Sequence, residues 1–314
     1  MKQLFLAVVP ILLGACATVP SDVPAVPRVD FHQHLVSPAF AQIAKLPERD
    51  GRALLAELDE AGIQRAVVLS VGYSSADERK NLPGPDALTS AENDWTSRQV
   101  VASGGRLIGM CSVNPLRDAA TAEIERCLTL PGMVGIKQHF GNSGVSLRNS
   151  DHLARMQQVF ALAQRLRAPI QVHMRARGGT NYGAEDARLF LEGLLPVAPD
   201  IEVVIAHLGS AGPGYAQADE IMAVFADAAR QNPHKIKRLF FDVATNVTPD
   251  TNADEAALIV SRLRAVGIDR ILYGSDLSPP GGSIAAGWEA FRSRLPLTPA
   301  ELRTIARNRP GYAR

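Results

Sequence analysis

Short apolar runs rich in β-branched residues alternate with longer segments of helical periodicity from residue 29 onward. The strand-like runs are residues 29–35, 63–72, 106–115, 133–140, 169–174, 201–210, 238–246 and 270–276. Helical patterns occupy residues 52–61, 87–103, 119–128, 151–167, 184–195, 215–231, 253–266 and 285–309, and Gly62 is expected to end the first of them. Strands that alternate with helices in this way form a parallel sheet covered by helices.

The number of these units predicts a single α/β domain, the (β/α)8 TIM barrel. Eight strand–helix units in 314 residues match the length that such a barrel needs. An open, doubly wound sheet is the alternative, and it usually carries a glycine-rich phosphate loop after its first strand. Here the first strand ends in His-Gln-His, so the barrel is favoured.

The first 28 residues differ from the rest of the chain. Lys2 precedes an apolar stretch that is shorter than the roughly 20 residues needed to span a bilayer but fits the core of a signal peptide. Its end, Leu-Gly-Ala-Cys at residues 13–16, resembles the lipobox of bacterial lipoproteins, which implies cleavage before Cys16 and lipidation of that residue. We therefore expect a signal peptide over 1–15, a proline-rich tether over 16–28 and the barrel over 29–314. An ordinary signal peptide with an incidental cysteine is the alternative.

Composition and charge narrow the class of partner. The chain has 33 basic and 32 acidic residues and 46% hydrophobic residues, as expected of a soluble globular domain without an electrostatic preference for nucleic acid. An envelope compartment would permit a disulfide between Cys111 and Cys127. Because one lies in a predicted strand and the other in the following helix, we expect two buried thiols instead.

Polar residues recur where the predicted strands end. They are His32 and His34 on the first strand, Lys137 and His139 on the fourth, His173 on the fifth, His207 on the sixth and Asp276 on the eighth. Catalytic groups of a TIM barrel lie at these carboxyl ends, and burying such groups without a partner is costly. Two imidazoles two residues apart on one strand face supply half of a metal site, although two unrelated histidines would give the same pattern. The cluster as a whole favours a site with a ligand or a reaction to serve.

These motifs, in this order, resemble the amidohydrolase superfamily. The His-x-His of the first strand, the single histidines ending the fifth and sixth, and Gly-Ser-Asp ending the eighth carry the resemblance, which extends over residues 29–309. It is strongest to the amidohydrolase-related family of TIM-barrel metal-dependent hydrolases. That family includes aminocarboxymuconate-semialdehyde decarboxylase and 2-pyrone-4,6-dicarboxylate hydrolase.

The resemblance implies a ligand set and a reaction. His32, His34, His173 and Asp276 would bind one divalent metal, expected to be Zn²⁺, and His207 would act beside it as an acid or base. A divalent cation lowers the pKa of bound water and polarises a carbonyl. We therefore expect a metal-dependent hydrolase of a small carboxylated or cyclic ester or amide substrate, with metal-activated water as the nucleophile and Asp276 and His207 as catalytic residues.

Two other functions stay open at this point. The first is a non-oxidative decarboxylase, a carbon–carbon lyase of the same family. The second is a catalytically silent envelope protein that keeps the barrel as a binding scaffold. The complete set of costly polar residues favours an enzyme over the scaffold.

Three further residues are candidates for substrate binding. Lys137 is expected to neutralise a substrate anion, with a structural ion pair to Asp30, or a carboxylated lysine bridging two metals, as alternatives. His139 is a candidate contact at the barrel mouth, with a purely structural histidine as an equal alternative. Arg175 follows His173 and is a candidate carboxylate clamp, unless its loop is simply solvated.

The expected partners are a small-molecule substrate and, through the lipid on Cys16, a membrane. Ala17 follows the cysteine, with no aspartate at that position, which favours the periplasmic face of the outer membrane of a bacterial cell envelope. Residues 277–282, after Asp276, depart from the family pattern, so the substrate pocket is less well predicted than the metal ligands. The sequence does not determine the oligomeric state.

Overall fold

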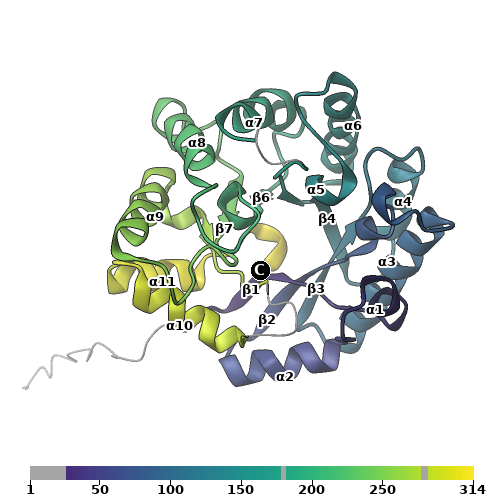
Figure 1. Ribbon diagram of the computed structural model, residues 1–314, viewed down its shortest axis with the longest axis horizontal. Coiled ribbons are helices and arrows are strands. Elements are labelled where there is room, and N and C mark those ends of the chain that lie inside the picture. Colours follow the sequence, from purple (N-terminus) through teal and green to yellow (C-terminus); the bar gives the residue numbers. More distant parts are fainter. Residues whose placement is uncertain (1–25, 178–181, 277–281) are drawn as a thin grey trace, which may run out of the picture.

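Eight short parallel strands form the centre of the molecule and pair in chain order. The computed structural model describes residues 26–177, 182–276 and 282–314. The strands are β1 (Val29–Gln33), β2 (Arg65–Leu69), β3 (Leu107–Ser112), β4 (Met133–His139), β5 (Ile170–His173), β6 (Val203–Ile205), β7 (Leu239–Asp242) and β8 (Ile271–Leu272). Helices surround them (Figure 1), and the predicted (β/α)8 barrel is confirmed.

The helices follow the predicted pattern with shifted ends. They are α1 (Pro38–Ala44), α2 (Gly51–Ala61), α3 (Pro85–Ala102), α4 (Ala120–Cys127), α5 (Phe140–Ser143), α6 (Ser150–Leu166), α7 (Ala184–Leu189), α8 (Asp219–Gln231), α9 (Ala253–Val266), α10 (Ile284–Arg294) and α11 (Pro299–Arg307). The Asp50 side chain caps the start of α2, and Gly62, with φ of 69°, ends it as predicted. The helix predicted over 184–195 is shorter because a wide π turn and Pro196 follow α7. The closing helical region consists of two helices, since residues 295–298 separate α10 from α11.

Backbone hydrogen bonds between the first and last strands close the barrel. The Phe31 N–H donates to the Tyr273 carbonyl at 2.8 Å, and the Asp276 N–H donates to the His32 carbonyl at 2.8 Å. Although β8 is only two residues long, the carboxyl ends of β1 and β8 are therefore held side by side. This contact joins His32 to Asp276, which is 244 positions later in the chain.

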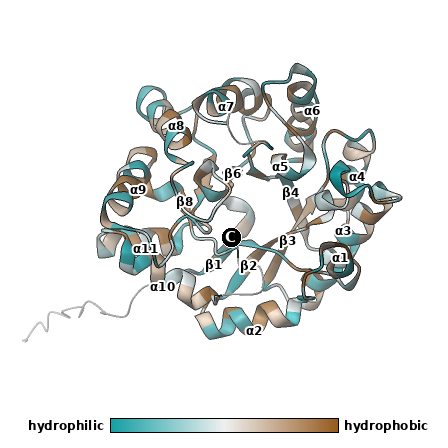
Figure 2. Cartoon of the chain, viewed as in Figure 1, coloured by the Kyte–Doolittle hydropathy of each residue, from teal (hydrophilic) through white to brown (hydrophobic). Residues whose placement is uncertain are grey.

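Apolar side chains fill both the barrel interior and the layer between strands and helices. Interior residues include Val29, Phe31, Val67, Leu69, Ile108, Met110, Val204 and Leu272. The carboxyl terminus appears at the centre of the view in Figure 1. There the Tyr312 ring packs edge-on against the Phe31 ring, with 6.5 Å between the ring centres. Along α2, apolar and polar residues alternate with the helical period (Figure 2), because one face covers the strands and the other meets solvent.

A β-bulge in β1 decides which side chains reach the barrel mouth. Asp30 pairs with Ala66 and Gln33 with Val68, so two steps along β2 correspond to three along β1. Both partner residues belong to the apolar layer under the helices. Simple alternation puts Asp30 on the face of His32, and the structure corrects this prediction. Asp30 instead accepts hydrogen bonds from Ser275 Oγ at 2.6 Å and Gln33 Nε2 at 2.8 Å.

The prediction of two free buried thiols is wrong. Cys111 of β3 and Cys127 at the end of α4 form a disulfide, with Cα atoms 6.0 Å apart. Both residues are fully buried and pack with Met133. Because α4 folds back onto β3, a residue on the outer face of the strand meets one on the inner face of the helix. Sequence separation alone does not reveal this approach.

In the ranges that the structure describes, no helix is both long and apolar enough to cross a membrane. The expected signal peptide and Cys16 lie outside the described residues, as does most of the loop after Asp276.

Candidate functional site

The carboxyl ends of the strands surround a cavity of about 390 Å³. Its lining includes all seven polar residues that the sequence places at strand ends: His32, His34, Lys137, His139, His173, His207 and Asp276. They come from β1, β4 and β5 and from the segments that follow β1, β6 and β8. The barrel therefore gathers residues spread over most of the chain into one site.

His32 and His34 direct one ring nitrogen each toward the same carboxylate oxygen. His32 Nε2 lies 3.7 Å and His34 Nε2 3.6 Å from Asp276 Oδ1. On the opposite side of the rings, His32 Nδ1 contacts Asp242 Oδ2 at 3.0 Å, and His34 Nδ1 contacts the Leu69 carbonyl at 2.7 Å. A carbonyl accepts hydrogen bonds only, so His34 carries its proton on Nδ1. Its Nε2 lone pair is then free to bind a ligand.

His207 approaches the other oxygen of Asp276. Its Nε2 lies 3.5 Å from Asp276 Oδ2, while its Nδ1 lies 2.8 Å from the Ala244 carbonyl. The backbone at His207 is left-handed, with φ of 55°, and its N–H donates to Asp242 Oδ1 at 3.0 Å. A single carboxylate, Asp276, therefore lies between the β1 histidines and His207.

Asp242 is a functional residue that sequence reasoning missed. It ends β7 and accepts hydrogen bonds that position both His32 and His207. A third bond comes from Gln171 Nε2 at 2.8 Å. Its place at a strand end is the signal that could have found it, because the same rule selected the other candidates.

His173 lies in a stack of rings at the mouth. Its ring is 3.9 Å from that of His139 and nearly parallel to it, and the Tyr73 ring lies 4.8 Å from that of His139, tilted by 33°. The His173 ring is also 5.1 Å from that of His207. Although His173 is only 8% exposed, its Nδ1 has no hydrogen-bond partner among the described residues.

Burial lowers the pKa of the histidines of the cavity and so favours their neutral form. Desolvation, followed by the positive charge of Lys137, lowers the pKa of His32 and of His34. Desolvation also lowers the pKa of His173, with the neighbouring His139 as the next cause. A neutral imidazole is the form that binds a metal ion.

Lys137 and Asp276 share the same buried space. Desolvation raises the pKa of Asp276, and the charge of Lys137 opposes this rise. Desolvation lowers the pKa of Lys137, and Asp242 and Asp276 oppose that fall. Lys137 is fully buried, yet its Nζ has no hydrogen-bond partner among the described residues. The carboxylates that act on it are these two, not Asp30.

The donor set fits a divalent cation. Three potential ligand atoms, one each from His32, His34 and Asp276, lie within 4.8 Å of one another. His32, His207 and Asp242 form a second such group. Neutral imidazoles with a carboxylate are the ligands of catalytic zinc and similar ions. His173 belongs to neither group, but it lines the same cavity, and its buried Nδ1 has no partner among the described residues.

Arg175 does not line this cavity. Its guanidinium hydrogen-bonds to Gln217 and lies over the Tyr182 ring, 5.6 Å from the ring centre. The structure thus brings together every predicted barrel residue of the site except Arg175.

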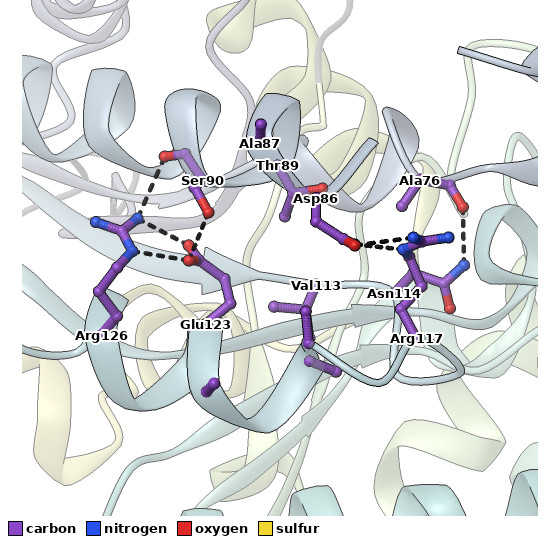
Figure 3. A pocket seen from close by; sticks show the side chains of 13 residues that line it. Ala76, Asp86, Ala87, Thr89, Ser90, Val113, Asn114, Arg117, Glu123 and Arg126 are labelled. Atoms are coloured by element: carbon purple, nitrogen blue, oxygen red, sulfur yellow. Dashed lines mark hydrogen bonds and ion pairs between the residues drawn. The ribbon is translucent and has the colours of Figure 1, made fainter. Parts of the chain in front are cut away.

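A second pocket, of about 280 Å³, lies outside the barrel between α3 and α4. Figure 3 shows that its charged side chains face one another in pairs, Arg117 with Asp86 and Arg126 with Glu123. Ser90 Oγ also donates to Glu123, at 2.6 Å. Because these charged side chains pair with one another, we interpret this pocket as part of the contact between α3 and α4 and not as a ligand site.

Comparisons with known proteins find structures of the same fold. Solved structures with the same fold include 2,6-dihydroxybenzoate decarboxylase from Rhizobium, with a TM-score of 0.60 and 17% identity over 89% of this chain and 95% of that one. A probable 2-pyrone-4,6-dicarboxylic acid hydrolase from Acinetobacter baumannii, with citric acid bound, has a TM-score of 0.59 and 17% identity over 88% and 95%. The 5-carboxyvanillate decarboxylase of Novosphingobium aromaticivorans, complexed with manganese, has a TM-score of 0.59 and 16% identity over 90% and 94%.

At these identities the structural likeness shows the fold. Among curated proteins, comparison of sequences finds no match to this chain. A family model described as Amidohydrolase matches residues 29–308, which is nearly the whole barrel. The chain belongs to the amidohydrolase family.

Proposed function

We propose that this protein is a metal-dependent hydrolase of a small carboxylated or cyclic ester or amide substrate. One observation carries the proposal: Asp276 has one oxygen beside His32 Nε2 and His34 Nε2, at 3.7 and 3.6 Å, and its other oxygen 3.5 Å from His207 Nε2. A carboxylate in this position can take part in metal binding through one oxygen and accept a proton through the other.

The residues that would hold the metal are His32, His34, His173 and Asp276. Zn²⁺ is the ion that we propose, and Mn²⁺ is tested beside it because relatives with this fold are complexed with manganese. When bound, a divalent ion polarises a carbonyl and makes water a stronger nucleophile at neutral pH. We propose one ion, with Lys137 uncarboxylated.

The chain's own residues would then manage the protons. Asp276 accepts a proton from the attacking water, a role favoured by the burial that raises its pKa. After the bond to the leaving group breaks, Asp276 returns that proton to the leaving oxygen or nitrogen. His207 is held through Nδ1 by the Ala244 carbonyl, so its Nε2 carries a lone pair. Nε2 lies 3.5 Å from the second oxygen of Asp276 and can accept a proton there as a base, returning it later as an acid.

The test is hydrolysis of a panel of lactones, esters and cyclic amides by the protein loaded with Zn²⁺ or Mn²⁺. Asp276→Asn is expected to lower kcat at least a hundredfold on any substrate found. Asp227→Asn, at an exposed ion pair on α8, is the control and should keep full activity. Activity that survives in Asp276→Asn would remove the proton-acceptor role. Protein that binds less than one equivalent of metal after growth with zinc and manganese would support the binding scaffold instead.

Decarboxylation is the second candidate, because two of the solved structures with this fold reported above are decarboxylases. In that reaction the same acid–base pair would protonate the substrate carbon before carbon dioxide leaves. Release of carbon dioxide from hydroxybenzoates, with no hydrolysis of the ester and amide panel, would establish the lyase and reject the hydrolase.

We further propose that the protein is lipid-anchored through Cys16 at the periplasmic face of the bacterial outer membrane. The Cys111–Cys127 disulfide supports an oxidising compartment. Cys16→Ala should move the protein from the membrane to the soluble fraction of cells. Continued membrane fractionation of this variant would reject the anchor.

A further inference from the structure

The cavity at the barrel mouth has two chemically different halves. Its floor carries the histidines, Asp276 and Lys137, whereas its outer wall is apolar and comes from the region of α1 and from the end of β2. The wall residues are Val36, Phe40, Ala44, Leu46 and Val71. A ligand that fills the space therefore has an apolar body next to the reacting group.

Lys80 lies at the rim of the same cavity, next to this apolar wall. Its Nζ is 2.5 Å from Ser74 Oγ and 5.2 Å from the centre of the Phe40 ring. The side chain is half-buried, and the aromatic ring and the hydroxyl fix the position of its ammonium group.

Asp77, whose negative charge acts on Lys80, forms its ion pairs with other residues. Asp77 forms ion pairs with Arg79 at 2.6 Å and with Arg177 at 3.0 Å. Among the described residues, no carboxylate lies within ion-pair distance of Lys80 Nζ. A partly desolvated ammonium without a carboxylate partner favours an anionic ligand.

A second cation of the cavity lies deeper. Lys137 is fully buried, and its Nζ has no hydrogen-bond partner among the described residues. The cavity thus carries one ammonium group at the floor and one at the rim, with the apolar wall beside the second. Asp242 and Asp276 act on Lys137, whereas no carboxylate of the described residues forms an ion pair with Lys80, so Lys80 is the cation that can receive a negatively charged end of a small molecule.

We propose that Lys80, together with Ser74 and Phe40, forms an outer subsite that binds a carboxylate of the substrate remote from the reacting group. The ammonium and the hydroxyl supply two hydrogen-bond donors for the two carboxylate oxygens, and the Phe40 ring packs against the neighbouring carbon atoms. That this ligand is a substrate rests on the proposed function. Its test uses binding alone.

The experiment measures binding by calorimetry to the Zn²⁺-loaded and to the metal-free protein. The probes are linear dicarboxylates from succinate to suberate, each compared with the monocarboxylate of the same chain length. One dicarboxylate length is expected to bind about tenfold more tightly than its monocarboxylate. Lys80→Met should abolish this preference, and Lys80→Arg should retain most of it. Arg79→Met, which removes the same charge from the neighbouring side chain that faces Asp77, should leave the preference unchanged.

Lys80→Met could lose all measurable binding, which would hide any change in preference. A charge-reversed variant avoids this because it predicts a gain of binding for a different ligand. In Lys80→Glu, 6-aminohexanoate should bind more tightly than adipate, the reverse of the order in the wild type. The proposal is overturned if no dicarboxylate binds the wild type, if dicarboxylates and monocarboxylates bind it equally, or if Lys80→Met keeps the preference. A protein that binds no metal and turns over no substrate would contradict the proposed function, whereas the dicarboxylate preference would still decide the role of Lys80.

Discussion

Three histidines at the barrel mouth each use one ring nitrogen for a supporting hydrogen bond and direct the other toward Asp276. His32 uses Nδ1 for Asp242, His34 uses it for the Leu69 carbonyl, and His207 uses it for the Ala244 carbonyl. Each ring therefore has a defined orientation, and its Nε2 faces Asp276. Such support outside the ligands themselves sets both the ring orientation and the basicity of the ligand nitrogen.

Asp242→Asn tests this support. The substitution keeps the shape but replaces one of the two accepting oxygens with an amide donor, so the side chain can no longer accept from both His32 Nδ1 and the His207 N–H. The affinity for Zn²⁺ should therefore fall roughly 10- to 100-fold. Metal titration against a fluorescent chelator measures the change, with Asp227→Asn on the surface as a matched control. An unchanged affinity would mean that Asp242 does not position these rings.

At the scale of elements, the local sequence pattern predicts whether a segment is a strand or a helix. It predicts less well which residues of other segments that element contacts. The alternation of strand and helix is confirmed throughout, yet a bulge in β1 rotates Asp30 away from the face that alternation assigns to it. The pairing of Cys111 with Cys127 likewise depends on how α4 packs on β3. Both departures come from contacts between elements, which a single segment does not encode.

The disulfide should stabilise the barrel through the loop it closes. Its cysteines are 16 residues apart, and a loop of about this length corresponds to roughly 3 kcal/mol in the chain-entropy model. The double variant Cys111→Ser, Cys127→Ser should therefore unfold at lower urea concentration than the wild type. Thiol titration of the unfolded wild type, secreted to an oxidising compartment, should find neither cysteine free. Two titratable thiols there would contradict the pairing.

The pair between α8 and α9 predicts a pH dependence of stability. Asp219 Oδ1 lies 2.8 Å from Arg262 Nε, and this hydrogen bond lowers the pKa of Asp219 below its ordinary 3.8. A carboxylate whose pKa is lower in the folded than in the unfolded state stabilises the fold at any pH above its unfolded-state pKa. This stabilisation is lost as the pH falls through its folded-state pKa. Arg262→Met should therefore destabilise the protein by about 1 kcal/mol or less at pH 7, and the difference should shrink below pH 3.8. Urea titrations at both pH values measure it, and a difference that grows in acid would contradict the assignment.

At the scale of the whole molecule, closure of the barrel builds the site. The hydrogen bond from the Asp276 N–H to the His32 carbonyl joins the first strand to the segment after the last. Metal ligands from both ends of the chain would consequently assemble only in the folded state. A bound ion should then stabilise that state.

Removal of the metal should lower the melting temperature. An ion present at a hundred times its Kd contributes about 2.7 kcal/mol to the folded state, which corresponds to a shift of roughly 4 to 5 °C for a domain of this size. Thermal unfolding with and without a chelator measures the shift. His32→Ala should melt at the same temperature in both conditions. Equal melting temperatures for the wild type would indicate that no metal binds at the mouth.

Much of the candidate site is visible in the sequence because barrel enzymes place their chemistry at strand ends. That rule selects His32, His34, His173 and Asp276. It applies equally to Asp242 at the end of the seventh strand, which was not among the predicted site residues. It does not select Lys80, since that residue lies in a loop whose course depends on α1 and β2. Arg175 shares a strand face with His173, yet it turns to Gln217 and Tyr182.

The sequence by itself determined the fold class, the order of strands and helices and the histidine and aspartate motifs, because hydrophobic period and residue type are local properties. The tertiary structure decided the face on which Asp30 lies at the bulge, the contacts of Asp242 with His32 and His207, the disulfide and the position of Lys80 beside the apolar wall. These features depend on distances between segments far apart in the chain, and only the closed barrel sets those distances.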